Sequence, residues 1–369
     1  MHKSLRGSAV ILAATALIIT GCSSGAPASE GDAATADVAA AQATLAEFAQ
    51  PTGFPVTTPL EALPTGARVA YAQCGTPNCA LFGDLMEAPA AALGMELTRV
   101  DAGQTADEVA TAFDSIVAGD YDAVIVSSIQ PALWSRYLDQ LVADEVPIIS
   151  TGNSGLDPAK VFLNAGDESL NTYGKVLADW VTVEADGPAE VALYVTPELA
   201  PTLTMQRAFE ERIAEVNPDA EVRVVEIPVA QFGSTASQIV VDDLLAHPNT
   251  EIVAFTLGEM MGGLPSALKA ADITGLKSIH AASTPATLEG IAAGEFTAGI
   301  TTDFGVYIWT LVDAAARAVV GQDVDQAVRD DELVMQVVTA EDLPEDNSKG
   351  WSGYPDFAER FAEIWGVQL

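Results

Sequence analysis

The residues of this chain that could perform covalent chemistry are few and lie far apart. Its 369 residues include three cysteines and three histidines. The sequence contains no GxSxG, HExxH, P-loop or GxGxxG pattern. Ser154 lacks the preceding strand of a nucleophile elbow, and His247 and His280 are distant in sequence. We therefore expect no catalytic residues, no enzymatic activity and no cofactor.

The first cysteine follows a segment that is typical of a secretory signal. Lys3 and Arg6 precede a short apolar run, residues 9–19. This run cannot cross a hydrocarbon core of ~30 Å, which needs roughly 20 residues. Its Ile-Thr-Gly-Cys end resembles the bacterial lipobox, whose cysteine is diacylated and becomes the mature N-terminus. We expect residues 1–21 to be a lipoprotein signal peptide and Cys22 to be lipidated. An ordinary cleaved signal and an uncleaved anchor are the alternatives.

The other two cysteines, Cys74 and Cys79, are close neighbours in the sequence. A CxxxxC spacing is poor for zinc, and no histidine lies nearby. In an oxidising compartment the two thiols are expected to pair and close a tight loop, worth roughly 2 kcal/mol in the chain-entropy model. We expect a disulfide that staples this loop, and no metal.

The charge of the chain is strongly acidic, with 52 Asp and Glu against 16 Lys and Arg and a net charge of −36. Such a surface repels phosphate backbones and anionic lipids. We therefore expect no nucleic-acid partner and no membrane contact except through the lipid anchor. The hydrophobic share of 49% is sufficient for a large core, and the length favours two domains.

An N-terminal segment without positive charge separates the signal from the expected folded region. Residues 23–66 contain no Lys or Arg and are rich in small residues and proline. The stretch 39–48 is compatible with a helix, but the composition as a whole favours a spacer. We assign 22–66 as a flexible, acidic, Ala-rich linker and expect order to begin near Arg68.

Beyond this linker, short apolar runs alternate with amphipathic segments. Expected strands are 68–73, 95–100, 123–126, 147–150, 190–195, 222–227, 252–256, 277–281 and 296–301. Expected helices are 80–93, 105–119, 131–143, 169–183, 204–216, 237–245, 264–271, 284–294 and 306–320. Apolar strands alternating with helices are typical of a parallel, doubly wound sheet. The two similar halves predict an α/β protein of two such lobes.

These features resemble the ribose-type periplasmic binding proteins (type 1) of ABC sugar importers. The resemblance spans roughly residues 67–340 and is strongest in QTADEVATAFDSIVAGDYDAVIVSS (104–128), VPIIS (146–150) and EMMGGLPSALKAADI (259–273). Pro77 matches a proline of the first cleft loop in the family. The tail from Gly350 to Trp365 is similar to an extension in many Gram-positive members.

The resemblance implies two lobes joined by three hinge crossovers, near Asn164, Thr302 and Val338. Lobe 1 would comprise residues 67–163 and about 303–338. Lobe 2 would comprise 164–302 together with about 339–369, including the C-terminal extension.

Ligands of such sheets bind at the carboxyl ends of the strands. The loops at those ends hold the polar residues that we predict to bind ligand, namely Gln73, Thr76, Asn78, Ser127, Gln130, Asn153, Thr196, Glu198, Thr202, Glu259 and Asp303.

The chain departs from its pentose-binding relatives at these loops. Asn78 and Cys79 replace stacking aromatics, and Gly152-Asn153 replaces an Asp-Arg pair that grips hydroxyls. Leu257 and Ala282 stand where relatives have Asn and Asp. Each buried hydroxyl without a partner costs roughly 1–3 kcal/mol, so these changes favour a smaller or less polar ligand. A sugar held by other polar groups is the equal alternative.

Three residues near these loops have structural alternatives to a binding role. Trp134 could stack on a ligand, but its helical spacing from Leu138 favours the core. Glu259 could accept a hydrogen bond from a ligand or be an acid at a helix N-terminus. His280, at a strand end, is more often structural than a ligand contact.

The function that these observations favour is substrate binding for an ABC importer. We expect an extracytoplasmic, lipid-anchored monomer that captures a small molecule in an interlobe cleft by hinge closure and delivers it to a permease with its ATPase. A sensory module that presents ligand to a membrane receptor is the alternative. An extracytoplasmic enzyme is disfavoured by the missing catalytic motifs.

Overall fold

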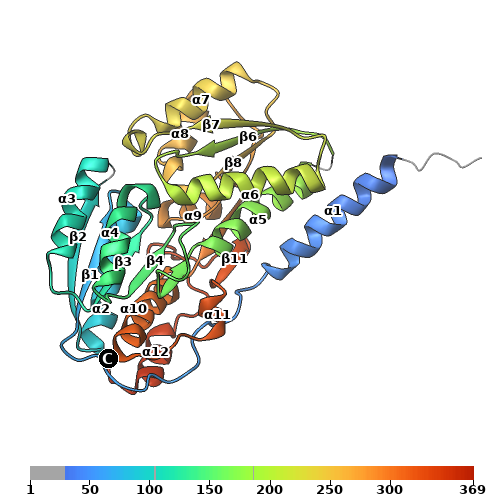
Figure 1. Ribbon diagram of the computed structural model, residues 1–369. Coiled ribbons are helices and arrows are strands. Elements are labelled where there is room, and N and C mark those ends of the chain that lie inside the picture. Colours follow the sequence, from blue (N-terminus) through green and yellow to red (C-terminus); the bar gives the residue numbers. More distant parts are fainter. Residues whose placement is uncertain (1–29, 104, 186) are drawn as a thin grey trace, which may run out of the picture.

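The computed structural model describes residues 30–103, 105–185 and 187–369, with side chains from residue 38 onward. The predicted signal peptide and Cys22 lie outside these residues. The described chain forms two lobes, each a sheet with helices on both faces (Figure 1). Within these ranges, no helix has the length and apolar character needed to cross a membrane.

Lobe 1 is built on a five-stranded parallel sheet in the order β2-β1-β3-β4-β5. Its strands are β1 (Arg68–Cys74), β2 (Glu96–Gly103), β3 (Ala123–Ser127), β4 (Ile148–Thr151) and β5 (Leu163–Ala165). One face is covered by α2 (Pro77–Ala92) and α10 (Phe304–Val320), and the other by α3 (Ala106–Val117) and α4 (Pro131–Ala143).

Lobe 2 is built on a six-stranded sheet in the order β11-β10-β9-β8-β6-β7, in which only the pair β10–β11 is antiparallel. Its strands are β6 (Glu190–Val195), β7 (Glu221–Glu226), β8 (Ile252–Phe255), β9 (Lys277–His280), β10 (Ala298–Thr302) and β11 (Met335–Val338). Its helices are α5 (Asp167–Ala185) and α6 (Ala200–Val216) on one face, and α7 (Ala236–Ala246), α8 (Leu264–Ala270) and α9 (Pro285–Ala292) on the other. Two single 3-10 turns are η1 (Val229–Gln231) and η2 (Gly258–Met261).

Local sequence signals set the starts of several helices. Thr105 forms a capping box with Glu108 at α3, and Thr284 caps α9, which has a proline in its first turn. Pro131 begins α4 in the same way. These signals gave helix bounds close to those observed, and the predicted fold class of two doubly wound α/β lobes is confirmed.

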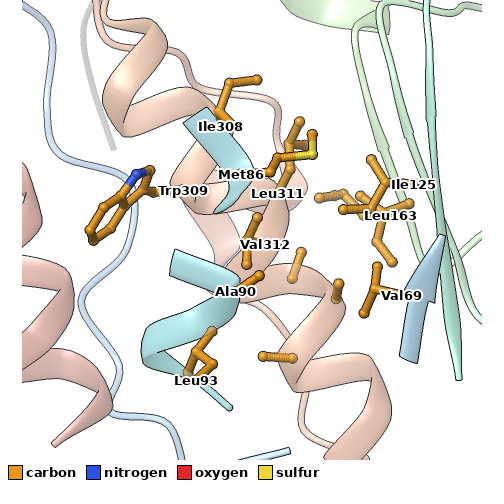
Figure 2. Close-up of a cluster of buried hydrophobic side chains, with 14 of the residues drawn as sticks. Val69, Met86, Ala90, Leu93, Ile125, Leu163, Ile308, Trp309, Leu311 and Val312 are labelled. Atoms are coloured by element: carbon orange, nitrogen blue, oxygen red, sulfur yellow. The ribbon is translucent and has the colours of Figure 1, made fainter. Parts of the chain in front are cut away.

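The core of lobe 1 shows how the two layers lock together. Val69, Ile125 and Leu163 project from the sheet towards Met86 of α2 and Leu311 of α10, as Figure 2 shows. All five side chains are buried. The apolar area removed from water at about 25 cal/mol per Å² is the main term that stabilises such a layer.

Trp309 extends from the opposite side of α10, away from the sheet (Figure 2). Its ring stacks on Trp365 of the C-terminal helix α12 (Phe357–Trp365), with ring centroids 5.5 Å apart. Phe361 of the same helix is fully buried against it. The C-terminal extension therefore packs on lobe 1, and its assignment to lobe 2 is wrong. The reason is that α10 is apolar on two faces, so α12 buries the face that the sheet leaves exposed.

The third crossover lies earlier than expected. The chain leaves lobe 1 after the short helix α11 (Gln326–Arg329) and joins lobe 2 as β11. The boundary near Val338 is therefore wrong. Four residues of β11 pair with β10, so this strand belongs to the sheet of lobe 2. The other crossovers, after β5 and after β10, lie where the family resemblance implied.

The N-terminal segment is ordered well before Arg68, contrary to the linker prediction. Helix α1 (Glu30–Glu47) contacts α5 and α6, with Ala41 fully buried. Residues 48–60 then cross from lobe 2 to lobe 1, where Val56 is buried. Small alanines allow close helix approach, so a composition that favours a spacer also suits a packed helix. The N-terminal end of α1 extends beyond the two lobes (Figure 1).

Candidate functional site

The carboxyl ends of the strands in both lobes face a common cavity. Its volume is about 80 Å³. The residues that line it are Cys74, Thr76, Asn78, Cys79, Phe82, Ser128, Thr151, Gly152, Gly166, Ser169, Leu170, Tyr173, Leu199, Pro201, Met205, Leu257, Glu259, Ala282, Thr302, Phe304, Tyr307 and Leu333. Both lobes and the crossovers contribute, so the cavity exists only in the closed arrangement.

Most of the cavity wall is apolar or aromatic. Phe82 of α2 packs against Phe304 and Tyr307 of α10, with ring centroids 5.2 and 6.3 Å away. Lobe 2 contributes Tyr173 and aliphatic side chains such as Met205. A wall of this kind favours ligands with an apolar body.

A tyrosine–threonine pair from each lobe borders the cavity. Tyr307 is hydrogen-bonded to Thr151 in lobe 1, and Tyr173 to Thr302 in lobe 2. Burial raises the pKa of Tyr173 to about 12 and raises the pKa of Tyr307 as well. Both phenols are therefore neutral at physiological pH, and their hydroxyl groups are already paired.

Glu259 is the acidic residue of the cavity. It lies in η2, after β8, and its Oε1 accepts a hydrogen bond of 3.0 Å from the backbone N–H of Asn78 in lobe 1. That N–H belongs to the first turn of α2, where amides have no partner within the helix and favour negative charge. Burial raises the pKa of Glu259 to about 7, against the opposing effect of the Asn78 bond.

The loop that presents Asn78 is tightly held. A disulfide joins Cys74 to Cys79. Thr76 caps α2, its Oγ1 accepting from the backbone N–H of Cys79 at 3.3 Å. The disulfide and the cap fix the direction of the Asn78 amide, so the loop is a rigid part of the cavity wall.

Two further contacts hold the lobes together around the cavity. The side-chain amide of Gln130 donates to the carbonyls of Pro197 and Glu198, at 3.1 and 3.2 Å. Ser154 Oγ lies 2.7 Å from Thr204 Oγ1. Together with the Asn78–Glu259 bond, they make the described arrangement a closed one.

Unusual backbone conformations occur where strands end at the cavity. Ser128 after β3 and Ala282 after β9 have φ of 52° and 50°, in the left-handed region that non-glycine residues rarely adopt. Gly166 at the first crossover approaches Gly152 so closely that an added Cβ would lie 2.8 Å from its nitrogen. Such conformations persist where the surrounding structure enforces them, and they cluster at binding sites.

Three of the predicted ligand-binding residues line the cavity, namely Thr76, Asn78 and Glu259. They come from the first loop of lobe 1 and from the loop after β8. Gln130 is not in the lining but bridges the lobes, and the exposed Glu198 takes part in this bridge through its backbone carbonyl.

The other predicted residues do not line this cavity, and their side chains are hydrogen-bonded elsewhere. Gln73 accepts from Arg99 on the surface, and Asp303 caps α10 and accepts from Ser352 and Tyr354. Bonds within their own lobe engage the side chains of Ser127, Asn153, Thr196 and Thr202. Each of these residues ends or follows a strand, but its side chain is hydrogen-bonded to nearby backbone or side-chain groups. Position in the sequence does not reveal these hydrogen bonds.

Sequence reasoning missed the aromatic lining. Tyr173 lies in the second turn of α5 and Tyr307 in the first turn of α10, the helices that follow the crossovers, and neither lies in a strand-end loop. Their signal was a tyrosine near the start of each crossover helix. Trp134 and His280 have the structural roles considered for them. Trp134 is buried and stacks on Phe113, and His280 contacts Ser283.

The lining of the cavity is poor in charged groups. Among the described residues, no group of three or more His, Cys, Asp or Glu side chains is arranged to hold a metal ion. Its described lining contains neither lysine, arginine nor histidine. A rigid, mostly apolar enclosure between two hinged lobes suits the capture of a small molecule.

Comparison with known proteins agrees with this architecture. The model of the periplasmic binding protein domain matches residues 69–323. No curated protein matches the sequence.

Among solved structures, a 5-methylthioribose transporter solute-binding protein from Thermotoga lettingae is similar, with a TM-score of 0.69 at 16% identity over 85% of this chain and 96% of that one. A solute-binding protein from Bacillus halodurans has a TM-score of 0.66 at 18% identity, covering 79% and 98% of the two chains. One from Mycobacterium smegmatis has a TM-score of 0.63 at 16% identity, covering 75% and 95%. At these identities the likeness establishes the fold. Because the family model covers more than half of the sequence, the chain belongs to the periplasmic binding protein domain family.

Proposed function

We infer that this protein is the substrate-binding component of an ABC importer, which captures a small molecule between its lobes. The observation that carries this proposal is the cavity that both lobes line at the ends of their strands. A ligand there contacts both lobes only when they are closed, so binding shifts the population towards the closed state. The three crossovers supply the hinge.

The similar solved structures support a small organic ligand. They are described as bound to 5-methylthioribose, myo-inositol and glycerol. Membership in the family implies a location outside the cytoplasm. There the protein acts as a monomer, performs no chemistry on its ligand and releases it to a permease with its ATPase.

A screen for thermal stabilisation tests ligand capture. Sugars, polyols, amines and small aromatics are added to the purified protein, and a ligand at a hundredfold excess over its Kd stabilises it by about 2.7 kcal/mol. The Leu170→Trp variant, which fills the cavity, should lose this effect. The matched Leu203→Trp variant, at an exposed position of α6, should keep it.

Delivery is tested by uptake of the identified ligand in cells that lack this protein. Uptake should fall to background and return when the chain is restored. Unchanged uptake of a ligand that does bind would contradict the importer role and favour sensing. A screen in which nothing stabilises the protein would contradict ligand capture itself.

In the same proposal, Cys22 carries the lipid that holds the receptor at the outer face of the cell membrane. Cell fractionation in the uptake experiment provides the check. The Cys22→Ser variant should leave the membrane fraction, and a variant that remains there would contradict the anchor.

A further inference from the structure

The cavity contains one acidic group that no basic side chain of its lining neutralises. Glu259 is the only Asp, Glu, Lys, Arg or His among the described lining residues. One carboxylate oxygen accepts from the Asn78 amide, and no described residue donates to the other. An anionic ligand would meet this carboxylate without a compensating cation, so carboxylates and phosphates are disfavoured.

Several neutral polar groups of the cavity are already hydrogen-bonded within the protein. Thr151 and Thr302 are bonded to the two tyrosines, and Ser169 Oγ donates to Asp331 at 2.7 Å. Thr76 Oγ1 accepts from Cys79. The Asn78 side chain and the Ser128 hydroxyl also line the cavity, but a ring with more hydroxyls than these groups can pair would bury the rest without partners, at roughly 1–3 kcal/mol for each.

The aromatic wall and the volume of the cavity indicate which kind of ligand body fits beside Glu259. The rings of Phe82, Tyr173, Phe304 and Tyr307 border the cavity, and aromatic faces attract cations. The cavity volume of about 80 Å³ favours a ligand with a compact body.

We propose that the ligand is a small organic cation, an amine with a compact apolar body, whose charge pairs with Glu259 while its body contacts the aromatic wall. This inference rests on the proposed function, because it specifies the ligand class of the same cavity. It differs from the sugars and polyols that the solved relatives bind.

The test compares two molecules of the same size and shape. 3-Methylbutylamine and 3-methyl-1-butanol each have six non-hydrogen atoms, and only the amine is charged. Isothermal titration should give an affinity at least tenfold higher for the amine. Equal affinities, or no binding of the amine, would overturn the proposal.

Glu259→Gln is the variant that isolates the charge. Its side-chain oxygen can still accept from Asn78, so the contact between the lobes is retained. Amine affinity should fall at least tenfold while alcohol affinity changes less than twofold, which also shows that the cavity is intact. Glu289→Gln, at an exposed position of α9, is the matched control and should bind as the wild type does. Unchanged amine affinity in Glu259→Gln would overturn the assignment.

The pH dependence gives a second readout. Because the pKa of Glu259 is about 7, amine affinity should decline from pH 8 to pH 6 as the carboxyl takes up a proton. Tyr173 and Tyr307 stay neutral there, and His280 beneath Gly258 has its pKa lowered to about 3. Asp331, behind the tyrosines, has a pKa of about 6 and titrates in the same pH range. The Glu259→Gln variant separates the two groups, because a decline caused by Glu259 is absent in it. A decline that persists in this variant would contradict the role of Glu259.

Ribose and myo-inositol complete the experiment and separate the two proposals. If either binds while both amine results fail, the receptor function stands and the cationic ligand is wrong. If the wider screen also yields no ligand, the receptor function fails with it.

Discussion

Buried ionisable side chains respond in opposite directions to pH. His280 is fully buried, its Nε2 lies 3.0 Å from Ser283 Oγ, and its Nδ1 has no partner among the described residues. Burial lowers the pKa of His280 to about 3 and raises the pKa of Asp331 to about 6. The stability from neutral His280 is present above the unfolded pKa near 6.5 and is lost as pH falls towards 3. The stability from protonated Asp331 is present below about pH 4 and is lost as pH rises through 6.

The His280→Gln variant should therefore be less sensitive to acid. Between pH 6.5 and 4 the unfolded wild-type chain binds a proton at this position that the folded protein does not. This proton steepens the fall of the unfolding free energy by up to about 1.4 kcal/mol per pH unit. Urea titrations at several pH values measure the slope, with the exposed His247→Gln as control. Equal slopes in the wild type and His280→Gln would contradict this account.

At the scale of elements, the loops at the strand ends do two different things. Some line the cavity and others hold the lobes together. Gln130, at the start of α4, belongs to the second group, because its amide bonds two carbonyls at the start of the loop after β6. These bonds exist only in the closed state, so their free energy contributes directly to the closing equilibrium.

Gln130→Ala should shift the protein towards the open state. Each lost hydrogen bond is worth about 0.5–1.5 kcal/mol, so ligand affinity should fall by roughly fivefold or more. Small-angle scattering should show a larger radius of gyration without ligand. Gln140→Ala, on the exposed side of α4, should change neither quantity. An unaltered affinity in Gln130→Ala would mean that its bridge does not favour closure.

At the scale of the whole molecule, the lobes are linked by more than the three hinge crossovers. Residues 48–60 run from α1 on lobe 2 to the core of lobe 1, and the C-terminal segment returns from β11 to α10. Thr52 fixes the first of these links to the third crossover. Its hydroxyl donates to the Leu333 carbonyl at 2.5 Å and accepts from the Met335 amide at 3.0 Å.

Thr52→Val should loosen this link while keeping the shape of the side chain. It leaves a half-buried carbonyl and amide unpaired, so the free energy of unfolding should fall by about 1–3 kcal/mol. Denaturant titration measures the loss, and the exposed Thr274→Val serves as its control. If both variants are equally stable, the N-terminal link does not contribute to holding the hinge.

The sequence by itself determined the two-lobe α/β architecture and most element positions. The signals for these elements are local, namely apolar strands, capping residues such as Thr105 and prolines at helix starts. Local signals can be recognised from the sequence alone. It also located Thr76, Asn78 and Glu259, because strand ends converge in any parallel sheet.

Only the tertiary structure decided which polar residues face the cavity and which satisfy their own lobe, as Thr196 and Asp303 do. It likewise decided that α12 covers α10 and that Tyr173 and Tyr307 border the site. These features depend on which residues the fold brings together, and some of these residues are far apart in sequence, such as Tyr173 and Thr302, which are 129 positions apart. The spacing of side chains along the chain carries no information about such contacts.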